Sequence, residues 1–149
     1  TLSQAANTQI LITTHSAVVV KELNFDHIRL ISQNGINRTV EEITPNQLPY
    51  PSLNEVNYLA FNEVTEEYHN ELYGYIEAEG WWPLFKAGKP TMNYSKIQRD
   101  GSTRLDQVIL TEYIRHQIHH PENTNNTRFT YAQLSQSIII MRSFIEAQP

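Results

Sequence analysis

The sequence has no cysteine, which excludes disulfide frameworks and thiolate metal sites. It also lacks long hydrophobic runs. The longest apolar stretches, residues 17–20 and 138–141, fall far short of the roughly 18 residues of a membrane-spanning helix. The chain does not open with the basic flank and apolar segment of a secretory signal. These absences favour a cytoplasmic protein with no membrane contact. A hydrophobic content of 40% over 149 residues suits one domain, or a small domain and part of another.

Positive charge is scarce in the first half of the chain. Residues 1–74 carry three basic and nine acidic side chains, a net of −6. Residues 75–149 carry eight basic and seven acidic side chains, a net of +1, so the chain totals −5. The second half repels a polyanion less than the whole chain does. Any contact with nucleic acid must therefore be local, or assembled from more than one copy.

The first 43 residues have the pattern of a small α/β fragment. Residues 8–14 (TQILITT) form an apolar run that predicts a buried, parallel strand. Ser16 is a candidate N-cap for a helix that ends at about residue 23. Residues 28–32 and 37–43 flank an Asn-Gly turn signal and predict a hairpin. We expect residues 1–43 to be the end of a larger α/β sheet, because so few strands leave their edges uncovered.

Residues 44–53 hold three prolines and predict a linker. From residue 54 the apolar periodicity becomes helical. We expect one long helix over about 55–79 closed by Gly80, a loop over 81–102, and a second helix over 103–120 stopped by Pro121.

A last helix opens at the capping box Thr130-x-x-Gln133 and continues to residue 146. Its inner stripe is predicted to consist of Leu134, Ser137, Ile138, Met141 and Ile145. The predicted fold class is mainly α, with residues 54–149 forming a helical bundle after a short α/β remnant.

His15 follows the first predicted strand, and ligands bind at the carboxyl ends of such strands in α/β sheets. Residues 9–32, with QILITTHSAVVVKEL and then IRLIS, resemble the switch segment of ABC-type ATPases, in the branch of the overcoming-lysogenization-defect defence ATPases. The resemblance implies that His15 reaches the γ-phosphate of ATP and the attacking water. The sequence contains no G-x-x-x-x-G-K-[ST] motif. We therefore expect ATP and Mg²⁺ to bind in an ATPase core outside this sequence, and no ATPase activity from this chain alone.

Residues 113–121 read YIRHQIHHP. Arg115 and His120 are separated by four residues, and the polar His116 follows the arginine. This segment resembles the R-x4–6-H motif of HEPN ribonucleases, whose domains are helical bundles of about the size of residues 54–149. The resemblance implies that Arg115, His116 and His120 are catalytic residues. It also implies a homodimer in which two motifs face one cleft. Defence ATPases with an appended nuclease, such as anticodon-nuclease ATPases, imply RNA, including tRNA, as the substrate.

The chemistry implied by this motif needs no cofactor in the helical domain. A histidine that titrates near neutrality can move the proton of a ribose 2′-hydroxyl, and an arginine that keeps its charge can stabilise the phosphate. His119, Glu71 and His69 are candidate supporting residues. Two other interpretations stay open. Histidines at a helix end complement its negative dipole, and the i, i+4 pair His116 and His120 has the spacing of a zinc pair.

Aromatic and basic residues between the predicted helices offer weaker signals. Trp81 and Trp82 can stack on bases, although packing in the core is the more common role. Five basic residues can follow RNA phosphates or simply be exposed: Lys86, Lys89, Lys96, Arg99 and Arg104.

The leading hypothesis is the C-terminal part of a prokaryotic defence or toxin ATPase that carries a metal-independent ribonuclease gated by ATP. The alternative is a non-catalytic helical module that dimerises the ATPase or docks a partner effector or an antitoxin. A DNA-sensing ATPase without nuclease activity in this part is a third possibility.

Overall fold

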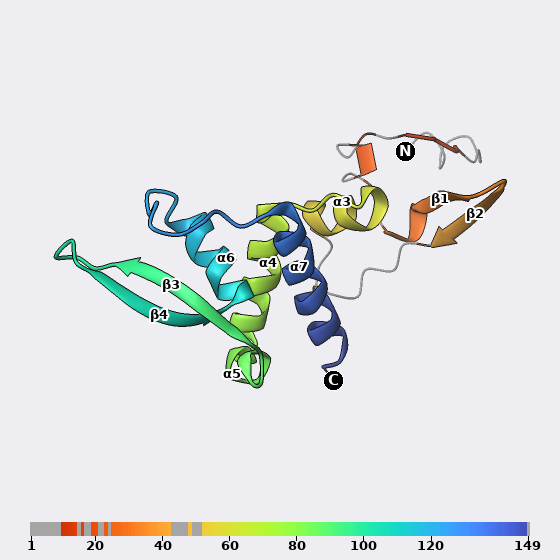
Figure 1. The fold of residues 1–149 in the computed structure, drawn as a ribbon. Coiled ribbons are helices and arrows are strands. Elements are labelled where there is room, and N and C mark those ends of the chain that lie inside the picture. The colour runs from red at the N-terminus through yellow and green to blue at the C-terminus, as the bar shows by residue number, and fades with distance from the viewer. Residues whose placement is uncertain are drawn as a thin grey trace. The chain divides into compact units, whose positions relative to one another are not determined.

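The computed structural model describes residues 10–14, 16, 19–20, 23, 25–42, 48 and 52–148. The chain divides into two compact units, Thr1–Thr44 and Pro45–Pro149. Figure 1 shows the elements of both units with the labels used below.

The first unit contains a β-hairpin, which confirms the prediction for residues 28–43. A single 3-10 turn, η1 (Phe25–His27), precedes β1 (Arg29–Asn34), and β1 pairs antiparallel with β2 (Asn37–Glu42). Gly35 opens the two-residue connection with a φ of 63°, a conformation that favours glycine.

The predicted buried strand over 8–14 is wrong for the residues that the structure describes. Residues 10–14 have no regular secondary structure, and the side chains of Ile10, Leu11 and Ile12 are exposed. No strand in the described part of this unit pairs with them. An apolar run has strand propensity, but a strand needs a partner for its backbone groups. His15 lies outside the described residues, as do most residues of the helix predicted after it.

The second unit is mixed α/β, so the predicted mainly α, HEPN-like helical bundle is wrong. Its described elements are α3 (Leu53–Phe61), α4 (Glu66–Ala78), α5 (Trp82–Lys86), β3 (Thr91–Ile97), β4 (Thr103–Ile109), α6 (Leu110–His119) and α7 (Tyr131–Glu146).

Helix α5 and a long β-hairpin replace the predicted loop over 81–102, and the hairpin also replaces the first part of the helix predicted over 103–120. β3 pairs antiparallel with β4 from Thr91↔Ile109 to Ile97↔Thr103. Gly101, with a φ of 82°, lies in the turn between them. Leu105 and Ile109 have helical spacing, but the β-branched residues around them fit the pleated ladder better. Figure 1 shows the hairpin extending away from the helices of this unit.

The helix predicted over 55–79 is two helices, because the chain changes direction at Asn62. Asn62 adopts the left-handed conformation, with a φ of 53°, and its N–H donates to the carbonyl of Tyr58 at 2.9 Å. Asparagine tolerates this conformation better than most residues do. Thr65 then caps α4, since its side chain accepts from the backbone N–H of Tyr68 at 3.1 Å.

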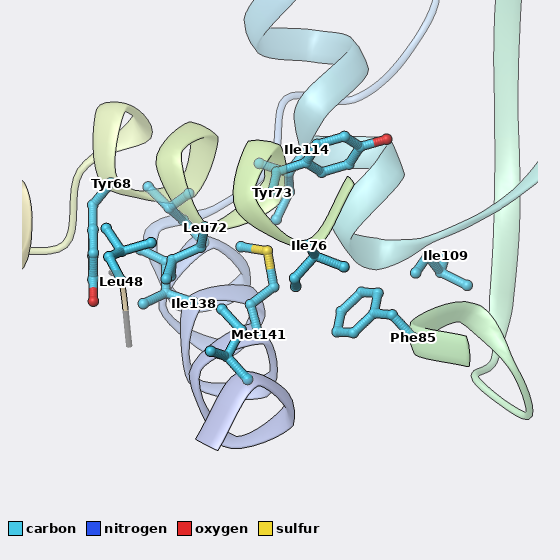
Figure 2. Packing of buried hydrophobic residues seen from close by; sticks show 12 residues of the cluster. Leu48, Tyr68, Leu72, Tyr73, Ile76, Phe85, Ile109, Ile114, Ile138 and Met141 are labelled. Carbon is cyan, nitrogen blue, oxygen red and sulfur yellow. The ribbon is translucent and has the colours of Figure 1, made fainter. Parts of the chain in front are cut away.

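The core of the second unit lies among α4, α5, α6 and α7, and Figure 2 shows its packing. Leu72 and Ile76 of α4 meet Ile138 and Met141 of α7, and Phe85 of α5 closes one end. The predicted inner stripe of α7 is confirmed at all five positions, and so is its capping box of Thr130 and Gln133. Trp81 and Trp82 pack against this core, as their more common role predicts.

Candidate functional site

The C-terminal end of α6 carries the histidines of the predicted site. The last helical residue is His119, and Pro121 follows two residues later, where proline cannot continue a helix. His120 leaves the helical conformation, with φ −127° and ψ 61°, while its N–H still bonds the carbonyl of His116 at 2.9 Å. The predicted stop of the helix at Pro121 is confirmed, and it exposes His120 at the helix end.

Arg115 and His120 lie on different sides of this helix end. The Arg115 guanidinium donates to Asn70 Oδ1 on α4 at 2.7 Å and stacks over the Tyr73 ring at 4.9 Å. His120 Nδ1 lies 3.1 Å from Glu122 Oε1. Within one chain, the structure therefore does not bring the two ends of the R-x4-H motif together.

His119 shares the side of Arg115. Partial burial lowers the pKa of His119, and the charge of Arg115 and then His120 lowers it further. His119 is thus close to the arginine, but it makes no side-chain hydrogen bond to another described residue.

His116 lies on the side of the helix that faces the β3–β4 hairpin. Its ring packs on Tyr94 of β3, with centroids 4.9 Å apart. Burial lowers the pKa of His116; Glu112 and Asp106 oppose this shift, while Lys96 and His120 add to it. His116 is therefore predominantly neutral at pH 7, close to both His120 and Lys96.

The segment after α6 fixes the hairpin beside these histidines. Asn123 donates to Tyr94 Oη at 3.1 Å and to the Ser95 carbonyl at 2.8 Å. Asn126 accepts from the Ser95 N–H at 2.8 Å and donates to its carbonyl at 3.0 Å. These four bonds hold β3 against the histidine-bearing end of α6.

A pocket of about 190 Å³ opens beside His120. Its lining residues are Gln117, His120, Pro121, Asn123, Thr124, Asn126 and Arg128. Arg128 donates to the Gln117 carbonyl at 2.9 Å and forms an ion pair with Glu66. The pocket therefore places the positive charge of Arg128 near His120. That charge is already paired with the carboxylate of Glu66.

The candidate supporting residues of α4 lie elsewhere. His69 is fully buried, and its Nε2 lies 3.1 Å from Ser137 Oγ, which donates to Thr111 Oγ1 at 2.9 Å. Burial, followed by the charge of Arg115, lowers the pKa of His69 to about 3. Glu71 accepts from Asn54 at 2.7 Å. Neither residue is hydrogen-bonded to His116 or His120.

Of the five predicted basic residues, only Lys96 influences the pKa of His116, and Arg99 is exposed in the turn between β3 and β4. Lys86 pairs with Glu112 at 2.7 Å, Lys89 lies over the Phe85 ring at 4.1 Å, and Arg104 pairs with Asp106 at 2.7 Å. Lys96 is exposed on β3 and contributes to the pKa shift of His116.

Sequence reasoning missed the roles of Tyr94 and Asn123, which position His116 and the hairpin. The alternation of residues 91–97 was the available signal, because it places Met92, Tyr94 and Lys96 on one face of a strand.

The zinc interpretation rests on the i, i+4 pair His116 and His120. No group of three or more His, Asp or Glu side chains suited to a metal ion gathers among the described residues. Likewise, no helix in the described part of the chain is long and apolar enough to cross a membrane.

No protein-family model, curated protein or solved structure matches this chain.

Proposed function

We propose that the second unit is a metal-independent endoribonuclease module whose reacting groups are His120, His116 and Lys96. The observation that carries the proposal is the arrangement of two histidines one helical turn apart. His120 is paired with Glu122, His116 is kept neutral by burial, and Lys96 lies near His116.

Cleavage of RNA at a phosphodiester needs three actions. A base takes the proton of the 2′-hydroxyl, an acid protonates the leaving 5′-oxygen, and a positive charge stabilises the phosphate as it gains charge. His116, neutral at pH 7, suits the base. His120 is assigned the role of the acid, because Glu122 Oε1, 3.1 Å from its Nδ1, orients the ring at the exposed helix end. Lys96 suits the third role. The products expected are a 2′,3′-cyclic phosphate and a free 5′-hydroxyl.

Arg115 has a positioning role in this proposal. Its guanidinium is bound to Asn70 and stacked on Tyr73, so it fixes α6 against α4. The positive charge that stabilises the phosphate then comes from Lys96 of the hairpin rather than from Arg115 of the motif.

The experiment compares cleavage of single-stranded RNA by single variants in the presence of EDTA. His120→Ala, His116→Ala and Lys96→Ala should each lower the rate by roughly 10². His119→Ala is the matched control, because it removes a histidine from the Arg115 side of the same helix end, and it should cleave at the parent rate. An RNA with a 2′-deoxy substitution at the cleaved position should resist. Full activity of His120→Ala, or complete loss of cleavage in EDTA, would overturn the proposal.

A non-catalytic dimerisation or docking module is the second candidate. It is favoured by the engagement of Arg115 with Asn70 and Tyr73, since an active motif arginine would face substrate. The same assay separates the two candidates, because a docking module binds a partner but cleaves no RNA with any of these variants.

We also propose that the first unit derives from the core of a defence ATPase that gates the module with ATP and Mg²⁺. The support is the resemblance of residues 9–32. Replacing His15 by Ala in a protein that carries the complete ATPase core should abolish ATP turnover while nucleotide binding persists.

A further inference from the structure

The two outer edges of the β3–β4 hairpin differ in how their backbone groups are covered. Asn126 bonds both the N–H and the carbonyl of Ser95, as a neighbouring strand would, and Asn123 adds a second donor to that carbonyl. The outward backbone groups of Ser95 in β3 are thus already hydrogen-bonded. In the described part of the chain, the backbone of residues 103–108 in β4 has no hydrogen-bond partner outside the hairpin, apart from the turn bond between Ser102 and Gln98 that precedes it. β4 is seven residues long and holds no proline or glycine.

We propose that β4 pairs antiparallel with β4 of a second copy of this chain, centred on Leu105, to form a four-stranded sheet. An uncovered strand of this length is a template for another strand. A closed two-fold pair satisfies both edges at once. The inference does not rest on the proposed function.

The charges of β4 select this register. When Leu105 faces Leu105 of the second copy, Arg104 stands opposite Asp106 of the second copy, and the reverse pair forms as well. A shift that centres the pair on residue 104 or 106 sets two arginines or two aspartates face to face, which destabilises a ladder. The strand is therefore self-complementary in one two-fold register.

The same register compensates a like-charge pair within each chain. Lys96 of β3 stands directly opposite Arg104 of β4, on the face that carries Tyr94. Arg104 has only Asp106 of its own strand as an ion-pair partner among the described residues. Pairing places a second aspartate beside Arg104, so that a row across the sheet becomes Lys96, Arg104 and Asp106 of the second copy.

The opposite face of the hairpin presents exposed apolar side chains. Leu105 is 60% exposed and Ile97 is 43% exposed. The cross-strand partners Ser95↔Leu105 and Ile97↔Thr103 put both side chains on the face away from Arg104. The two-fold pair brings Leu105 against Leu105 of the second copy and removes part of the Leu105 side chain from water.

Single cysteines test the pairing, because the parent chain has none. Leu105→Cys should form a disulfide-linked dimer, because facing residues in an antiparallel ladder have Cα atoms about 4.5–5.5 Å apart, within disulfide range. Thr103→Cys alone and Gln107→Cys alone should not, since each would be about 13 Å along the strand from its own copy. A mixture of these two variants should cross-link, because residue 103 faces residue 107. Ile139→Cys, 51% exposed on α7, is the control for random collision.

At micromolar protein, Leu105→Cys should oxidise about 10²-fold or more faster than Ile139→Cys, since pairing gives an effective concentration near millimolar. Equal rates would overturn the proposal. So would cross-linking of the Thr103→Cys and Gln107→Cys mixture no faster than of either variant alone.

A charge exchange tests the register without cysteine. Arg104→Asp and Asp106→Arg each place like charges opposite one another, so each alone should be monomeric by light scattering. Mixed together they restore both opposite-charge pairs and should form a heterodimer. Circular dichroism checks that each variant keeps its fold. A monomeric mixture of folded variants, beside a dimeric parent, would overturn the register; a monomeric parent would overturn the pairing itself.

Discussion

Acid should destabilise the second unit through His69. Its ring is fully buried between α4 and α7, and burial with the nearby Arg115 charge lowers its pKa to about 3, against 6.5 in an unfolded chain. Between these two values the unfolded chain binds a proton that the folded chain does not. Stability therefore rises with pH across this window and falls as pH drops below about 6.5. From pH 7.5 to pH 5.5 the loss from this one group is about 1.4 kcal/mol.

The assay is urea unfolding at both pH values for the parent and for His69→Gln. The glutamine amide can still bond Ser137 but does not titrate. Carboxylates and the other histidines titrate in both proteins, so the difference between the two pH responses isolates residue 69. With a urea slope of about 2 kcal/mol/M, the parent midpoint should fall by about 0.7 M more than the variant midpoint. Equal falls in the two proteins would refute a buried, neutral His69.

Two further substitutions test the packing that supports the site. Ile138 is fully buried on α7, so Ile138→Ala should lower the free energy of unfolding by about 2–5 kcal/mol. Ile139, at the next position, is half-exposed, so Ile139→Ala should change the free energy of unfolding by less than about 0.5 kcal/mol. Denaturant titration of both variants measures the two changes. Asn126→Ala removes two hydrogen bonds to the backbone of Ser95. Exchange of the Ser95 amide hydrogen should become about tenfold faster or more, equivalent to about 1.4 kcal/mol or more, while the amides of α7 stay protected. Unchanged exchange at Ser95 would contradict the role given to Asn126.

Local signals in the sequence predicted α7 and the first hairpin correctly. The capping box of Thr130 and Gln133 and the apolar stripe of α7 are contained within one element, so no distant residue decides them. The Asn-Gly signal before β2 is likewise local, and it predicted the turn of the β1–β2 hairpin.

The β3–β4 hairpin was not predictable in this way. Leu105 and Ile109 are spaced by four residues, which fits a helix as well as every second position of a strand. The decision comes from Asn123, which lies outside the segment and holds β3 in place by its bond to Tyr94. A tertiary contact of this kind outweighs local propensity, and the fold class follows from it.

The sequence suggests His69 as a supporting residue of the histidine site. The ring is instead fully buried, because Ser137 of α7 supplies a hydrogen-bond partner inside the core. A histidine is compatible with either environment, and only the residue that packs against it decides between them.

The rotation of the α-helix explains which residues lie together in the candidate site better than the R-x4-H spacing does. Five residues of an α-helix advance about 500°, so positions 115 and 120 point about 140° apart, whereas positions 116 and 120 lie one turn apart. The end of α6 at His119 does not cancel this rotation, since Arg115 stays bound to Asn70 while His120 meets Glu122. The hairpin lies on the side of His116, and it brings Lys96 to that side. The positive charge closest to His116 in this arrangement therefore comes from Lys96 of β3, whose placement depends on the fold rather than on its distance along the chain.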